Sequence, residues 1–201
     1  MKKIIILISI FILSCSPNNN GIETIEIMSY YYDLNESQTE FKTEFVTYSI
    51  INENGNVETI QKTPFSKKVN LNFKSTVDRK IIDKVYLNSK NKNEEYYNKR
   101  LKNPSIEVSC GPIIRIKIKY KTQKEITFNY SENKADSRFK EFIELQRAIQ
   151  NNYSEKRFNK IEKSIELEKK QKDFEKYTLN KDTLNFPFPP LPQRNPIKFT
   201  K

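Results

Sequence analysis

The chain has 201 residues, with 36 Lys and Arg against 25 Asp and Glu, and its formal net charge is +11. It contains no histidine and only two cysteines, Cys15 and Cys110. These counts exclude catalysis by histidine, zinc sites of the Cys/His type and a disulfide-rich fold.

The first residues have the pattern of an exported protein. Lys2 and Lys3 precede an apolar run, residues 4–13, which only Ser9 interrupts, and a polar stretch follows after residue 15. The run is too short to span a bilayer comfortably. We therefore predict a signal peptide over residues 1–14; a buried core segment is the alternative.

The end of that run, "ILSC" at residues 12–15, resembles the lipobox of bacterial lipoproteins. The resemblance implies that the Cys15 thiol receives a diacylglycerol and that the chain is cut just before it. It also implies a lipid anchor in the inner or outer membrane of the cell envelope. Ser16 resembles the residue found in lipoproteins that are sent on to an outer membrane. Export makes nucleic acid an unsuitable partner.

After removal of residues 1–14, 34 Lys and Arg remain against 25 Asp and Glu, a net charge of +9. A basic chain is attracted to anionic lipid or to acidic wall polymer. The alternative is the composition of an AT-rich genome, in which Lys, Asn and Ile are abundant and Arg is scarce. Residues 15–21 are expected to form the lipidated cysteine and a flexible tether.

A domain is predicted over residues 22–153, and its first part has the alternation of short strands. One side of the first strand is expected to hold Ile25, Ile27, Ser29 and Tyr31, and one side of the second Val46, Tyr48 and Ile50. Asn54-Gly55 predicts a hairpin turn with both residues at positive φ. In the next strand, Val69, Leu71 and Phe73 are expected inward, and Asn70 and Asn72 outward.

Helical spacing then begins. Ser75 and Asp78 resemble a capping box, and Val77, Ile81 and Val85 form an apolar stripe. The segment "NEEYYNKRL" predicts a further helical turn or two that ends before Pro104. Tyr96 and Tyr97 suit either a binding surface or, more commonly, the edge of a core.

The clearest pattern is a hairpin of residues 114–130. Its apolar positions are expected to face inward. A helix follows, which Asp136 is expected to cap, and the inward stripe of this helix includes Ile143 and Gln146. Neither a strand nor a helix buries its apolar side alone, so the helix should lie on the sheet. We predict an α+β fold, an antiparallel sheet with helices packed on one face. The predicted core includes Ile114, Ile116, Ile118, Phe128, Phe139, Phe142 and Ile149.

The outward positions of the same hairpin predict a basic row. Arg115, Lys117 and Lys119 alternate with the isoleucines, so a strand must display them on one face about 7 Å apart. We hypothesise that the row binds an anionic surface. The alternative is that these charges keep the sheet face soluble or protect an edge strand from pairing.

Residues 154–178 predict a charged helix with few apolar residues: Phe158, Ile161, Ile165 and Phe174. It is expected to lie on the domain or to form a short coiled-coil strand, or else to be a solvated extension. Residues 179–201 form a proline-rich tail. Its sequence "PPLPQR" resembles ligands of SH3 domains, but a spacer or surface strap is the simpler interpretation for an exported chain.

No motif for chemistry appears. The chain has no Gly-rich phosphate loop, and Cys110 is expected to pack as a small apolar residue. We therefore expect no cofactor and no enzymatic activity. The expected function is a binding or structural module for an envelope protein or an anionic polymer. The alternatives are an inhibitor or immunity-type protein and a carboxylate-based hydrolase. The body resembles small α+β lipoproteins of unknown role in AT-rich bacteria.

Overall fold

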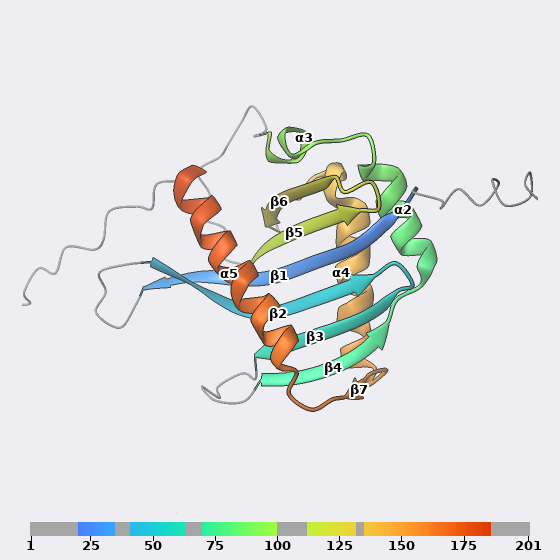
Figure 1. Cartoon of the computed structure of the whole chain (residues 1–201), viewed down its shortest axis with the longest axis vertical. Helices are drawn as coiled ribbons and strands as arrows, with labels where there is room; N and C mark the ends of the chain where they lie inside the picture. The colour runs from blue at the N-terminus through green and yellow to red at the C-terminus, as the bar shows by residue number, and fades with distance from the viewer. Residues whose placement is uncertain (1–19, 35–40, 63–69, 100–111, 132–134, 186–201) are drawn as a thin grey trace, which may run out of the picture.

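The computed structural model describes residues 20–34, 41–62, 70–99, 112–131 and 135–185. They form a seven-stranded antiparallel sheet with helices on both faces, which confirms the α+β class (Figure 1). In chain order the elements are β1 (Ile22–Leu34), β2 (Phe41–Asn52), β3 (Asn56–Lys62), β4 (Asn70–Thr76), α2 (Arg79–Ser89), α3 (Glu94–Asn98), β5 (Ile113–Tyr120), β6 (Glu125–Ser131), η2 (Ser137–Phe139), α4 (Lys140–Ser154), β7 (Asn159–Lys160) and α5 (Ile165–Asn185).

The strand order is β6-β5-β1-β2-β3-β4-β7. Strands β1 to β4 follow one another as a meander, and α2 and α3 then lead back to β5, which pairs with the free side of β1. Strand β1 is therefore interior, and it is hydrogen-bonded to β2 on one side and to β5 on the other. No helix in the described part of the chain is long and apolar enough to cross a bilayer.

Helices α2, α3 and α4 cover one face of the sheet. The core there contains every residue that the sequence predicted for it. Tyr97 of α3 stacks on Phe128 of β6 with ring centroids 4.2 Å apart, and Phe142 of α4 contacts Phe128 edge-on at 4.9 Å. Aromatic pairs in these geometries add to the free energy gained from burial. The prediction that helices cover this face is confirmed.

Helix α5 lies across the other face, as Figure 1 shows. It buries Leu167 and Phe174 against Met28, Tyr30 and Tyr48. The ring of Phe174 lies 5.7 Å from that of Tyr48. The alternative in which the charged helix packs on the domain therefore holds, and it explains why β1 is apolar on both sides: Met28 and Tyr30 face α5, whereas Ile25 and Ile27 face the other core.

The contact between α5 and the sheet also contains a carboxyl group. Glu175 accepts hydrogen bonds from Thr43 of β2 at 3.3 Å and from Gln171 at 2.8 Å. Desolvation by burial raises the pKa of Glu175 above its ordinary value, and these two bonds oppose the rise only in part. The folded state thus favours the protonated form.

Glu175→Gln is expected to remove a pH-dependent loss of stability. A carboxyl whose folded pKa is raised destabilises the fold as pH rises from its ordinary pKa through the raised value. The parent and the variant should have equal unfolding free energies near pH 4, and the variant should be the more stable at pH 7. Urea denaturation across this range measures the difference, and parallel pH profiles would contradict the assignment.

The β2–β3 hairpin is confirmed, but its turn differs from the prediction. Three residues, 53–55, connect the strands, and of these only Gly55 has a positive φ, 83°. A Cβ at Gly55 would lie 2.4 Å from the carbonyl oxygen of Val77. Glycine is required there both by the backbone conformation and by the close approach of the chain that enters α2.

The capping box predicted at Ser75 is wrong. Ser75 lies in β4 and is buried, and Asp78 caps α2 by accepting a hydrogen bond from the Lys80 N–H at 2.9 Å. Asp136 does cap its helix, although the capped turn is the short η2 that leads into α4. Asn72, predicted outward, is only 5% exposed, and the chain after β7 lies against it: the Ile161 N–H donates to the Asn72 carbonyl at 3.0 Å.

The charged helix begins later than predicted. Residues 155–164 form a turn, the short strand β7 and a loop, and α5 runs from Ile165 to Asn185 rather than from residue 154 to 178. Phe158 packs at the edge of the sheet, 4.9 Å from Phe73, and Ile165 is 82% exposed. The expectations for residues 1–19, for Cys110 and for residues 186–201 lie outside the described residues.

Candidate binding groove

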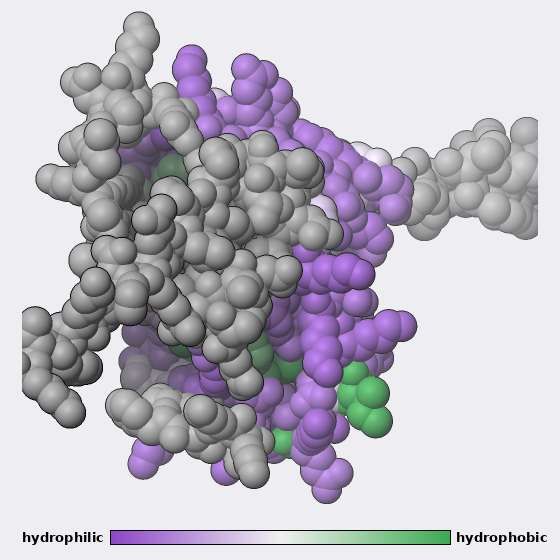
Figure 2. Space-filling model, turned by 90° about the vertical axis from the view of Figure 1, so that its left-hand side faces the viewer, coloured by the Kyte–Doolittle hydropathy of each residue, from purple (hydrophilic) through white to green (hydrophobic). Residues whose placement is uncertain are grey.

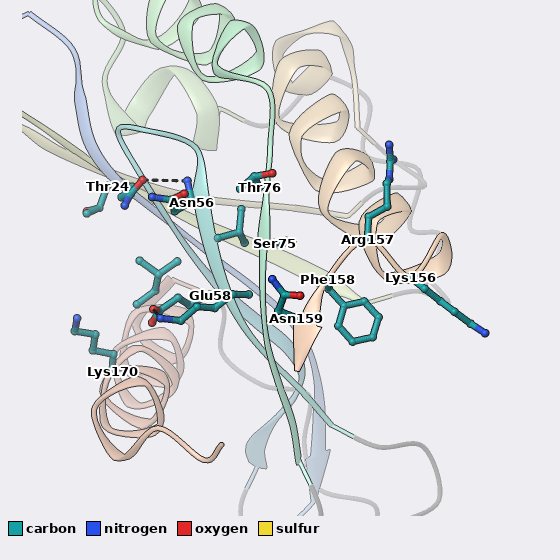
Figure 3. A pocket seen from close by; sticks show the side chains of 14 residues that line it. Thr24, Asn56, Glu58, Ser75, Thr76, Lys156, Arg157, Phe158, Asn159 and Lys170 are labelled. Atoms are coloured by element: carbon teal, nitrogen blue, oxygen red, sulfur yellow. Dashed lines mark hydrogen bonds and ion pairs between the residues drawn. The ribbon is translucent and has the colours of Figure 1, made fainter. Parts of the chain in front are cut away.

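The side of the sheet that bears α5 is only partly covered, and a groove of about 790 Å³ opens beside the helix (Figure 3). Its floor consists of the ends of β1 to β4 that lie nearest the β2–β3 turn. One wall is the start of α5, with Lys170, and the other is the segment after α4, with Lys156 and Arg157. We call this hollow the basic groove.

Strand register explains the chemistry of this face. Moving from under α5 toward the β2–β3 turn, the first row across the sheet is the buried set that includes Arg115, Met28 and Tyr48. The second row is charged except at Ile50 and contains Lys117, Glu26, Ile50, Glu58 and Lys74 in adjacent strands. The third row is neutral along β1 to β4 and contains Thr24, Asn52, Asn56 and Thr76.

The predicted basic row on β5 is placed differently from what its sequence suggests. Strand β5 is interior, so the row protects no edge. Arg115 lies on the face of the sheet that bears α5, and it is only 4% exposed. Lys119 pairs with Glu23 at 2.8 Å, and this hydrogen bond raises the pKa of Lys119. Lys117 lies 3.4 Å from Glu125 and 3.9 Å from Glu26. The binding role of the row remains a prediction.

These lysines line a second hollow of about 380 Å³ that adjoins the basic groove along Thr24, Ile50 and Lys170. Among its described lining residues, three lysines face three carboxylates. Glu26 also accepts a hydrogen bond from the buried Tyr48 hydroxyl, and burial raises the pKa of that hydroxyl. Because opposite charges are equal in number in this lining, the hollow has little net attraction for an anion.

The basic groove is different because cations outnumber carboxylates in its lining. Its described lining residues include four cations, Lys74, Lys156, Arg157 and Lys170, and one carboxylate, Glu58. Lys74 pairs with Glu58 at 2.7 Å, Lys170 with Glu166 at 2.8 Å and Arg157 with Glu155 at 3.0 Å. These pairs are largely exposed, and such pairs contribute about 0–1 kcal/mol, so an anionic ligand can replace the carboxylates.

Lys156 occupies a backbone position that normally favours glycine. Its φ is 57°. The Lys156 N–H donates to the Tyr153 carbonyl at 3.1 Å, and the Arg157 N–H donates to the Asn152 carbonyl at 2.7 Å. These two bonds form a Schellman motif that ends α4 and places Lys156 and Arg157 at the border of the groove. A lysine here costs about 1–2 kcal/mol in backbone strain.

Sequence reasoning missed these cations because they come from β4, from the turn after α4 and from α5. In the described part of the chain, no group of three or more His, Cys, Asp and Glu could hold a metal ion. On the face shown in Figure 2, hydrophilic residues predominate in the described surface and hydrophobic ones emerge only at scattered points. No family model matches the chain, and neither does any curated protein sequence.

Proposed function

We propose that the chain is a lipid-anchored, non-catalytic binding module of the bacterial cell envelope, and that it holds an anionic partner in the basic groove. The lipobox-like residues 12–15 support the location. The charge of the groove supports the activity: its described lining has four cations and one carboxylate, and the ion pairs that three of these cations make are largely exposed. The partner is an envelope protein or polymer that carries negative charge.

Lys156→Gly tests the groove without destabilising the fold. It removes one cation and also relieves the backbone strain of a lysine in the left-handed conformation. The variant should be more stable than the parent by about 0.5–1 kcal/mol, since the relieved strain exceeds the added entropy of the unfolded chain. Gln123→Gly is the matched control: Gln123 also has a positive φ, 65°, and it carries no charge. Thermal and urea unfolding measure both.

The mature chain with Cys15→Ser, which has no site for lipid, should be retained on immobilised dextran sulfate at low salt and released as salt is raised. Lys156→Gly combined with Arg157→Gln should weaken retention severalfold, because each exposed charge contributes up to about 1 kcal/mol. Lys117→Gln combined with Lys119→Gln should have a smaller effect. Equal retention of the parent and the groove variant would contradict the proposal, and a larger effect of the β5 variant would move the site to the basic row.

A further inference from the structure

The row of the groove floor nearest the β2–β3 turn is uncharged, although charged residues surround it. Thr24, Asn52, Asn56 and Thr76 lie side by side on four adjacent strands, and Figure 3 shows Thr24, Asn56 and Thr76 at the same end of the hollow. Their row spans about 14 Å, since neighbouring strands are about 4.8 Å apart. Hydroxyl and amide groups both donate and accept hydrogen bonds. The floor therefore suits a ligand rich in hydroxyl groups.

The amide of Asn52 is held in a fixed orientation. Its Oδ1 accepts hydrogen bonds from the backbone N–H groups of Asn54 and Asn56, both at 3.0 Å. These bonds belong to the turn, so the Nδ2 end of the amide points away from it. A side chain fixed in this way loses little conformational entropy when it binds a ligand.

The cations stand around this floor rather than on it. Lys156 and Arg157 lie on one wall and Lys170 on the other, while Lys74 belongs to the charged row between them. A ligand that contacts floor and walls together must present hydroxyl groups to the strands and negative charge to the walls. A flat bilayer fits poorly, because the neutral floor lies within the hollow and the cations rise at its sides.

An acidic peptide fits less well than a sugar chain. Extended peptides commonly bind by adding a strand to an exposed sheet edge, whereas this floor is the face of strands that are already paired. The nearest edge, that of β4, is occupied as well: β7 pairs with it, Ile161 N–H donates to the Asn72 carbonyl at 3.0 Å, and Asn152 Nδ2 donates to the Thr76 carbonyl at 2.7 Å.

We propose that the partner held in the basic groove is a single chain of an acidic polysaccharide, whose hydroxyl groups lie on the Thr/Asn floor and whose anionic groups lie against Lys156, Arg157 and Lys170. This inference rests on the proposed function, because it names the chemical class of ligand for the same groove. It adds a role for the uncharged floor, which general attraction between opposite charges does not require.

The test uses the mature chain with Cys15→Ser and three probes: oligogalacturonate, poly-L-glutamate and vesicles that contain phosphatidylglycerol. Thr24→Val with Thr76→Val removes two floor hydroxyls and preserves charge, shape and β-branching. This floor variant should weaken oligogalacturonate binding about fivefold to tenfold, the loss of two hydrogen bonds. Thr122→Val, in the exposed β5–β6 turn, should leave it unchanged. Calorimetric titration at low salt measures binding, and urea unfolding confirms that the variants are folded.

The outcomes separate the two proposals. Tighter binding of oligogalacturonate than of poly-L-glutamate, with a loss in the floor variant alone, supports the acidic polysaccharide. Equal binding of both polymers that depends on Lys156 and Arg157 but not on the floor overturns this inference and leaves the proposed function standing. Binding to vesicles only overturns the inference as well. Binding of every probe that is insensitive to Lys156 and Arg157, or no binding at all, overturns both.

Discussion

Replacing Ile116 with alanine is expected to lower the free energy of unfolding by about 2–5 kcal/mol. Ile116 is fully buried in β5, where Ile27 of β1 and Phe128 of β6 flank it in adjacent strands. Truncation leaves a cavity between three strands that are tied by their ladders and cannot close over it. The loss is a large share of a total stability on the order of 5–15 kcal/mol.

Chemical denaturation of Ile116→Ala measures this cost, and Ile165→Ala is the matched control. Ile165 has the same side chain but is 82% exposed at the start of α5. Its truncation should change stability by less than about 0.5 kcal/mol. If both variants lose a similar amount, the packing of the α2/α4 face is not what stabilises the fold.

Replacing Cys15 with serine is expected to abolish labelling of the chain by a fatty-acid analogue and to move the protein out of the membrane fraction. The resemblance to the lipobox implies that the Cys15 thiol is the lipid acceptor, and a hydroxyl does not replace a thiolate nucleophile. Several acyl chains on one residue give a stable anchor, because each buried methylene contributes about 0.8 kcal/mol.

Cys110→Ser is the control for this experiment, since Cys110 is the only other thiol of the chain. Labelling should persist in that variant. Metabolic labelling followed by membrane fractionation reads both effects. Persistent labelling of the Cys15→Ser chain, or its loss in Cys110→Ser alone, would overturn the assignment of the anchor.

The sequence allowed the α2/α4 side of the fold to be predicted, because its signals are local. The β5–β6 hairpin alternates cleanly over both strands, and the helix after it repeats its apolar residues at helical spacing. Each pattern depends only on the geometry of one element. All seven residues predicted for the core are buried there.

Helix α5 and β7 were harder to place because their boundaries depend on tertiary contacts. Residues 154–164 have helical composition, but the Schellman motif at Lys156 ends α4, and pairing with β4 draws Asn159 and Lys160 into the sheet. The buried side of α5 includes the polar residues Gln171 and Thr178. A hydrophobic stripe therefore could not reveal which side of this helix faces the sheet.

The candidate groove could not be predicted from sequence. Its cations are separated by about half the chain, and only the strand register brings Lys74 beside the turn that holds Lys156 and Arg157. The adjacent Lys156-Arg157 pair was visible in the sequence, but it fell within the segment predicted as a charged helix. The basic row on β5 was easier to see in the sequence. Its ion pairs were not, because the partner carboxylates Glu23, Glu26 and Glu125 lie on neighbouring strands.

The interior position of β1 has a mechanical consequence. The described chain starts at one end of the sheet, whereas α5 ends toward the opposite end (Figure 1). A pull on the chain before Ile22, directed along β1, would have to break the ladders of that strand. Its ladders to β2 and β5 run perpendicular to such a force. The load is then shared by many hydrogen bonds in shear on both sides of the strand, and the sheet would resist extraction of β1 far better than it would resist peeling of an edge strand.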